Sequence, residues 1–188
     1  MVRTAEAVDP RIRRTRQLLQ QALDKLLKKK NFDDISIQDI ADEATVNRAT
    51  FYDHYDDKFS LLACMIACRF HDLLAERKIR FEGGCRSQLT EIVRAVCDYL
   101  IGMQKLEPPM ESAIITAVRE NLLSGIKQHL PASAIAPDRI APEMMAASAS
   151  WAIYGAAKEW AQTPDRCSPE EVAETVTMLV APILRMPV

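Results

Sequence analysis

A run of polar and aromatic side chains between residues 47 and 54 has the chemistry to contact nucleic acid. It supplies an amide, a guanidinium, a hydroxyl, a phenol and an imidazole, from Asn47, Arg48, Thr50, Tyr52 and His54. Such groups hydrogen-bond to phosphate oxygens and to base edges, and a guanidinium can bond both acceptors of a guanine. We therefore predict a DNA-contacting surface here, although a surface helix without this function also carries such residues.

The residues around this run predict two short helices joined by a tight turn. Ser36 is a good N-cap for the first helix, with Asp39 where a capping box places an acid. Apolar residues then recur at helical spacing, at Ile37, Ile40, Ala41 and Ala44. The small side chain of Ala41 allows a close crossing by the second helix, expected from residue 48 or 49 to 55. Two short helices crossing in this way are the helix-turn-helix pattern.

Flanking segments complete a small three-helix domain. A helix is expected from about Pro10 to Lys30, with an apolar stripe at Leu19, Ala22, Leu23, Leu26 and Leu27. Phe32, Ile35 and Val46 should fill the core from the connections, and Phe51 and Tyr55 should anchor the second short helix from its inner face. A further helix, capped by Asp56 or Asp57, should bury Phe59, Leu62, Ala63, Ile66, Ala67 and Phe70.

The overall charge of −2 conceals an uneven distribution along the chain. Residues 1–30 contain nine Lys and Arg against three acids, whereas residues 31–58 contain two basic residues against eight acids. A basic N-terminal segment suits nucleic acid, but a solvated helix of this composition is an equally good interpretation. Charge alone therefore decides nothing.

The segment from residue 11 to 65 resembles the TetR family of bacterial regulators. The family pattern is a string of the form IA…A-G-V-S…T-x-Y-x-H-F…K…L. Residues in register with it are Ile40, Ala41, Ala44, Val46, Thr50, Phe51, Tyr52, His54, Tyr55, Lys58, Leu61 and Leu62. One position departs: the family usually has Gly where this chain has Thr45, a β-branched residue that disfavours positive φ. The turn should therefore either change conformation or store about 1 kcal/mol of strain or more.

The resemblance implies an all-α fold of about nine helices, with a helix-turn-helix domain at 1–58 and an effector-binding and dimerisation domain at 59–188. A helix at about 58–79 would connect the two domains, and a new set of helical segments begins after residues 82–84. In the DNA-binding domain the resemblance implies that Asn47, Arg48, Ala49, Thr50 and Tyr52 face the major groove. It implies phosphate contacts for Ser36, Tyr52, His54 and Lys58, with Arg11, Arg13, Arg14 and Arg16 along the backbone or in the minor groove. The acids Asp39, Asp42 and Glu43 should face solvent.

The C-terminal two-thirds predicts four helices, at 86–105, 110–130, 143–162 and 168–185, separated by proline-rich connections. The last two are the most apolar, and Ser168 should cap the final one with Pro169 at its first position. Small residues between 146 and 156 permit close helix approach. These two segments either form the core of a monomeric bundle or, as the resemblance implies and we favour, pair with a second copy.

An effector site is a weaker inference from this half. Cys97, Tyr99, Met103, Met110, Ile114, Trp151 and Tyr154 would suit an adaptable apolar cavity, although such side chains are more often core. No acid or base in this half stands out as a partner for a charged ligand. Cys64, Cys68 and His71 share one helical face, where they would either bind a soft metal, act as redox thiols or simply pack.

Three functions remain to be weighed. The first is a repressor released from a palindromic operator by a small apolar or aromatic effector. The second is a constitutive dimeric regulator whose C-terminal half serves dimerisation or protein partners. The third, an enzyme, has little support, because the three histidines accompany no nucleophile or metal-ligand motif. We expect no cofactor and no membrane insertion, and the polar, basic N-terminus and unpaired cysteine spacing favour the cytoplasm.

Overall fold

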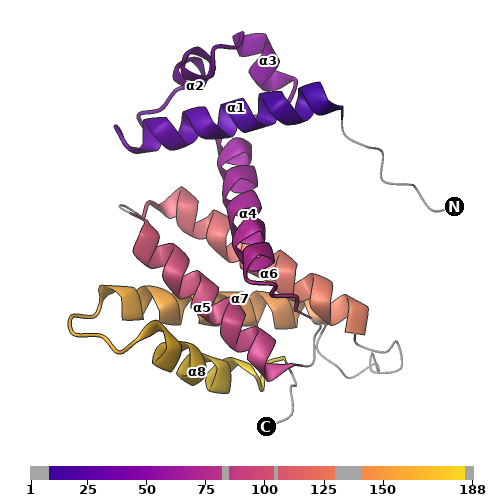
Figure 1. Cartoon of the computed structure of the whole chain (residues 1–188), viewed down its shortest axis with the longest axis vertical. Helices are drawn as coiled ribbons and strands as arrows, with labels where there is room; N and C mark the ends of the chain where they lie inside the picture. The colour runs from indigo at the N-terminus through magenta and orange to yellow at the C-terminus, as the bar shows by residue number, and fades with distance from the viewer. Residues whose placement is uncertain (1–8, 82–84, 104–105, 130–140, 185–188) are drawn as a thin grey trace, which may run out of the picture. The chain divides into compact units, whose positions relative to one another are not determined.

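A computed structural model of the chain describes residues 9–81, 85–103, 106–129 and 141–184 (Figure 1). These residues form eight α-helices and no strand, which confirms the all-α prediction, against the approximately nine helices expected. The chain divides into two compact units, Met1–Met65 and Ile66–Val188, and the division falls inside one long helix. No helix in the described ranges is long and apolar enough to span a membrane.

The N-terminal unit contains α1 (Pro10–Leu27), α2 (Ile37–Ala44), α3 (Arg48–Tyr52) and the first turns of α4 (Lys58–Glu76). Most of its predicted core is confirmed: Leu19, Leu23, Phe32, Ile35, Ile40 and Phe51 are all almost completely buried, whereas Leu27 and Val46 are half-buried. Two helices are shorter than predicted. The chain leaves α1 in a turn where the amides of residues 29 and 30 share the Leu26 carbonyl, and it leaves α3 where those of residues 54 and 55 share the Phe51 carbonyl.

The predicted buried face of α4 is partly wrong. Asp57 caps the helix by accepting the Ser60 amide proton at 2.7 Å, but Phe59 is 50% exposed and Ala63 is exposed too. The buried positions are Leu61, Leu62, Met65, Ile66, Phe70 and Leu74. Apolar residues occur on almost every side of this helix, so spacing alone did not select the face that packs.

The C-terminal unit contains the rest of α4 with α5 (Arg86–Gly102), α6 (Pro108–His129), α7 (Pro142–Gln162) and α8 (Pro169–Val180). Helix α7 packs against α5, α6 and α8, and α5 also packs against α8 (Figure 1).

The four predicted C-terminal segments are all present, with different ends. Helix α6 begins at Pro108 rather than after the proline pair, because proline is tolerated in a first helical turn. Ser168 caps α8 as predicted, in a reciprocal capping box with Glu171. The expected restart at 82–84, much of the connection before α7, and residues 185–188 lie outside the described residues.

Candidate DNA-binding surface

Helix α2 begins at a well-defined capping box. The Ser36 hydroxyl accepts the Asp39 amide proton at 3.1 Å, and the Asp39 carboxylate accepts the Ser36 amide proton at 2.7 Å. Both predicted members of the motif are therefore present, and they fix the residue at which the helix-turn-helix begins.

The turn between α2 and α3 keeps a left-handed residue at Thr45, with φ 58° and ψ 43°. The Thr45 amide bonds the Asp42 carbonyl at 3.1 Å, and the Val46 amide bonds the Ala41 carbonyl at 2.9 Å, so the last carbonyls of α2 are satisfied. Of the two outcomes expected for the Gly-to-Thr departure, the structure has the strained one. A β-branched residue in this region costs about 1–2 kcal/mol.

Helix α3 has the predicted inner face and part of the predicted outer face. Asn47 caps it by accepting the Ala49 amide proton at 3.0 Å, and Phe51, at 0% exposure, fixes its inner side. Arg48, Ala49 and Tyr52 are exposed on the other side, whereas Thr50 and His54 are half-buried.

Arg48 and Tyr52, the two side chains best suited to read DNA, contact each other. A guanidinium nitrogen of Arg48 donates to the Tyr52 hydroxyl at 3.2 Å, and the guanidinium carbon lies 5.7 Å from the centre of the tyrosine ring. Positions four apart are neighbours on a helix, so Tyr52 supports Arg48 on the outer face of α3.

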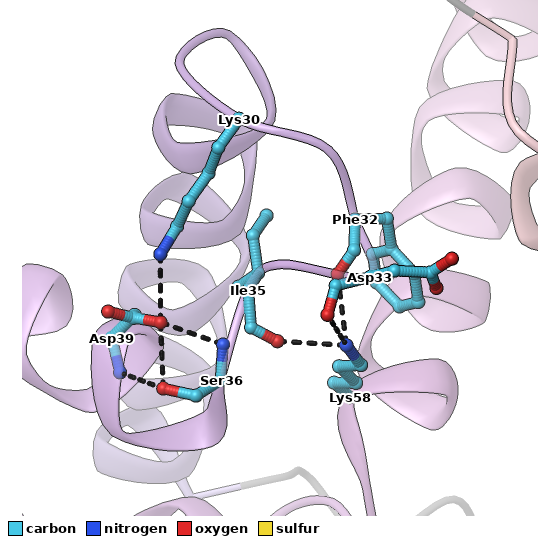
Figure 2. A network of polar contacts seen from close by, with 7 residues as sticks. All are labelled: Lys30, Phe32, Asp33, Ile35, Ser36, Asp39 and Lys58. Carbon is cyan, nitrogen blue, oxygen red and sulfur yellow. Dashed lines mark hydrogen bonds and ion pairs between the residues drawn. The ribbon is translucent and has the colours of Figure 1, made fainter.

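Lys58, predicted to contact a phosphate, is engaged inside the N-terminal unit. Its ammonium group donates to three backbone carbonyls of the α1–α2 connection, those of Phe32 at 2.9 Å, Asp33 at 3.1 Å and Ile35 at 2.9 Å (Figure 2). An ammonium group has three protons, and all three are used here. Lys58 therefore fastens α4 to this connection.

Ser36 is engaged in the same way. Its amide and its hydroxyl both bond the Asp39 carboxylate, which also forms an ion pair with Lys30 at 2.9 Å (Figure 2). The Ser36 amide and hydroxyl are thus both used within the capping box. We therefore leave Ser36 out of the phosphate contacts proposed below.

Lysines at the end of α1 neutralise acids of α2. Besides the Lys30–Asp39 pair, Glu43 lies 3.3 Å from the ammonium of Lys25 and 3.7 Å from that of Lys29. The hydrogen bond from Lys30, followed by those from Ser36, holds the pKa of Asp39 well below its ordinary value. The hydrogen bond from Lys25 and the charge of Lys29 lower the pKa of Glu43. The acids on this face are thus largely balanced inside the unit, rather than simply facing solvent.

The N-terminal arginines lie on the helix that was predicted from about Pro10. The side chain of Asp9 accepts the Arg11 amide proton at 2.8 Å and starts α1, so residues 11–16 are its first turns. Arg11, Arg13, Arg14 and Arg16 are all exposed, and the Arg16 guanidinium lies 5.9 Å from the centre of the Tyr55 ring. Residues 11–16 are therefore helical, and the first eight residues lie outside the described part.

The residues predicted to bind an effector differ in burial. Cys97, Met110, Ile114 and Tyr154 are at most 4% exposed, and Met103 is half-buried. Trp151, by contrast, is 63% exposed, because it lies on the outer stripe of α7, and its assignment to an interior cavity is wrong. Burial also raises the pKa of the Cys97 thiol to about 12, which disfavours the thiolate.

The sequence interpretation missed a charged pair in the C-terminal unit. Lys158 of α7 lies 2.6 Å from the Glu111 carboxylate of α6, and both side chains are only about one-third exposed or less. The two residues are 47 positions apart, so no local pattern connects them.

The residues considered for metal or redox chemistry, Cys64, Cys68 and His71, have different surroundings. The Cys64 sulfur accepts hydrogen bonds from Gln20 at 3.5 Å and from the Tyr55 hydroxyl at 3.7 Å, whereas Cys68 is exposed. His71 is exposed beside Asp72. Cys64 thus joins the packing of the N-terminal unit, and no group of three metal-ligating side chains occurs among the described residues.

Comparison with known proteins is consistent with this geometry. Residues 19–65 match the family described as bacterial regulatory proteins, tetR family. Over 60 residues the chain is 48% identical to the uncharacterized HTH-type transcriptional regulator YxbF of Bacillus subtilis (strain 168). That match covers 31% of this chain and 16% of the relative's length.

Solved structures match along most of the chain. A TetR transcriptional regulator from Streptococcus agalactiae 2603V is 19% identical, with a TM-score of 0.55, covering 94% of this chain and 99% of that one. FadR from Thermus thermophilus, crystallised with lauroyl-CoA, is 19% identical, with a TM-score of 0.53, covering 88% and 92%. RolR, crystallised with resorcinol, is 14% identical, with a TM-score of 0.56, covering 95% and 96%. At these identities the structures support the fold alone. The chain is similar to the tetR family of bacterial regulatory proteins over residues 19–65, the segment that contains the helix-turn-helix.

Proposed function

We propose that the chain acts as a homodimeric repressor that binds a palindromic operator through α3 and leaves it when a small molecule binds the C-terminal unit. The DNA-binding part of this proposal rests on the outer face of α3. There the Arg48 guanidinium, supported by the Tyr52 phenol, projects from a helix that Phe51 anchors. A recognition helix reads bases in this way from the major groove. Proposed DNA contacts are Asn47, Arg48, Ala49, Thr50 and Tyr52 at the groove, with His54, Arg14 and Arg16 at phosphates.

The dimer is supported by an apolar surface on α7 and α8. Met144, Trp151, Met178 and Leu179 are between 57% and 69% exposed. Gly155, on the same outer stripe of α7 as Trp151, has open space where a side chain would extend, so another helix can approach closely there. Large exposed apolar side chains grouped on two helices are typical of protein interfaces, so we assign this surface, within about 143–162 and 168–185, to a second copy.

Operator binding by an Arg48→Ala variant tests the DNA-binding proposal. The operator is first selected from random duplex DNA with the full-length protein. Arg48→Ala should then weaken binding at least tenfold and relax the preference at one base pair of each half-site, since one good bidentate contact is worth about 1–3 kcal/mol. Lys29→Gln is the matched control, because its charge faces Glu43 rather than DNA. Unchanged binding by both Arg48→Ala and Tyr52→Ala would contradict the assignment.

Effector release rests on a different observation. The printed descriptions of RolR and FadR name small ligands, resorcinol and lauroyl-CoA. A ligand of this chain must bind one state of the dimer better than the other to alter operator affinity. The complete burial of Cys97 and near-complete burial of Ile114 favour the alternative, a constitutive regulator whose C-terminal unit only dimerises. Operator occupancy that no small molecule alters would support that alternative.

A further inference from the structure

Tyr52 is exposed, but the core of the N-terminal unit helps to fix the direction of its ring. Phe51 is fully buried, and the rings of Phe51 and Tyr52 stand nearly perpendicular, at 83°, with 5.6 Å between their centres. Edge-on packing of this kind is a preferred arrangement of aromatic rings. The Tyr52 hydroxyl therefore projects from α3 in a direction that a buried neighbour helps to set.

The Tyr52 ring and hydroxyl in turn hold Arg48. One guanidinium nitrogen of Arg48 donates to the Tyr52 oxygen at 3.2 Å, and the guanidinium carbon lies 5.7 Å from the centre of the ring. The Asn47 side chain caps the same turn by accepting the Ala49 amide proton at 3.0 Å. A long side chain thus has a preferred position before any partner arrives, which lowers the entropy that it loses on binding.

Together the two side chains offer almost only hydrogen-bond donors. A guanidinium has N–H groups and no acceptor, and the oxygen of the Tyr52 phenol already accepts a proton from Arg48. The other N–H groups of Arg48 and the phenol proton of Tyr52 remain, and no group among the described residues accepts them. A partner of this pair must therefore supply hydrogen-bond acceptors.

In the major groove of DNA, bases differ in the acceptors that they show. Guanine shows two, N7 and O6, and thymine shows O4, whereas cytosine shows only the donor at N4. A guanidinium matches the two acceptors of guanine, and a phenol proton matches a single acceptor. The Arg48 nitrogen and the Tyr52 oxygen are 3.2 Å apart, close to the roughly 3.4 Å between successive nucleotides of a strand. The two groups can therefore meet two successive bases.

We infer that Arg48 and Tyr52 read two successive bases of each operator half-site, a guanine through the Arg48 guanidinium and a neighbouring guanine or thymine through the Tyr52 hydroxyl. Tyr52 has two roles in this arrangement, because it positions the guanidinium and also donates to a base. A cytosine at either position places an amino donor against the pair and is rejected. The inference rests on the operator binding by α3 proposed above, and it adds the chemical class of the bases that are read.

The first test replaces the guanines of the selected operator, one at a time, with 7-deazaguanine, which lacks the N7 acceptor but keeps base pairing. At one guanine of each half-site the replacement should weaken binding of the full-length protein about tenfold, the effect of one hydrogen bond to a charged group. The same replacement should not weaken binding of Arg48→Ala. Binding that no such replacement weakens, or that the parent and Arg48→Ala lose equally, would overturn the inference.

Tyr52→Phe removes the hydroxyl and keeps the ring against Phe51. At the base next to that guanine the parent should prefer guanine or thymine to cytosine about fivefold, and the variant by less than about twofold. Tyr55→Phe is the matched control, because the Tyr55 hydroxyl bonds the Cys64 sulfur inside the unit, and it should keep the full preference. If the Tyr52 hydroxyl met a phosphate instead, Tyr52→Phe would weaken binding of all sequences equally and leave the preference intact, which contradicts the inference.

Arg48→Lys keeps the positive charge but loses the planar fork. The salt dependence of operator binding should keep its slope in this variant, whereas the preference for the guanine should fall several-fold. This measurement separates the reading of a base from general attraction to phosphates. An undiminished preference for guanine in Arg48→Lys would show that the guanidinium geometry does not read it.

The outcomes also separate this inference from the proposed function. If the full-length protein enriches no sequence from random duplex DNA, operator binding fails and the inference fails with it. If an operator is selected but its base preferences change with neither Arg48 nor Tyr52, operator binding stands and the inference fails.

Discussion

Thr45 is a threonine in a backbone conformation that glycine adopts at the least cost. Its φ of 58° brings a β-branched Cβ against its own backbone. The turn keeps this geometry because the amides of Thr45 and Val46 bond the last carbonyls of α2. Thr45→Gly should raise the stability of the N-terminal unit by up to about 1 kcal/mol, after subtraction of the greater freedom of glycine in the unfolded chain. The increase is measured as a higher thermal unfolding midpoint.

The control for this change is Thr45→Val, which keeps the branched Cβ and hence the strain. Its midpoint should stay close to that of the parent chain. A gain from valine equal to that from glycine would show that the hydroxyl, and not the backbone, is responsible.

Lys58 donates to three backbone carbonyls, and we propose that it stabilises the N-terminal unit rather than contacting a phosphate. Lys58→Met should lower the stability of the N-terminal unit by about 2 kcal/mol, because three carbonyls lose a charged donor and those of Phe32 and Ile35 are partly buried. Thermal unfolding measures this loss. The salt dependence of operator binding should keep its slope, because no phosphate contact is lost.

A phosphate contact would give the opposite pattern. If Lys58 neutralised a phosphate, Lys58→Met would leave stability nearly unchanged and reduce the salt slope by about one. Arg14→Gln is the comparison for the slope, since Arg14 is exposed and is among the proposed phosphate contacts.

At the scale of elements, α1 and α2 are connected by ion pairs that depend on pH. The folded chain holds the pKa of Asp39 below its ordinary value, so the carboxylate stabilises the fold at neutral pH. This contribution is complete above the ordinary pKa of an aspartate and is lost as the pH falls toward the folded pKa. The fall in unfolding midpoint between about pH 7 and about pH 3 should therefore be smaller for Asp39→Asn than for the parent.

Asp34→Asn provides the matched comparison, because Asp34 is an exposed acid outside the capping box. That variant should lose as much midpoint as the parent over the same range. An equal loss in the parent and in Asp39→Asn would show that this pair contributes nothing to folding.

At the scale of the whole molecule, the apolar surface on α7 and α8 is expected to be where two copies meet. Trp151→Glu combined with Leu179→Glu should convert the dimer to a monomer in sedimentation experiments, because each copy would bring two desolvated carboxylates into the symmetric interface. Operator affinity should fall with it, since each half-site would then be bound separately. The matched control is Ile101→Glu on α5, which is 45% exposed. A dimer that survives the double change but not the control would place the interface elsewhere.

The outline of the N-terminal unit was predictable because its signals are local. The capping box at Ser36, the burial of Phe51 and the departure at Thr45 each depend on residues a few positions apart, and the structure has all three. The buried side of α4 was not predictable in the same way. Its sequence is apolar almost all round, and only packing exposes Phe59, whose ring lies nearly perpendicular to that of Phe32, with 5.2 Å between the ring centres.

For the polar and aromatic run at residues 47–54, some properties follow from the sequence and others only from the tertiary structure. The sequence by itself determined that a short capped helix follows the turn and that Arg48 and Tyr52 face outward from it, because helical spacing and N-cap chemistry act over a few residues. Only the tertiary structure decided which nearby charges are available to DNA. Lys58 is used by three carbonyls 23 to 26 residues away, and Lys25, Lys29 and Lys30 are balanced by acids of α2. Ion pairs and hydrogen bonds of this kind depend on distances in space, which the order of residues along the chain does not contain.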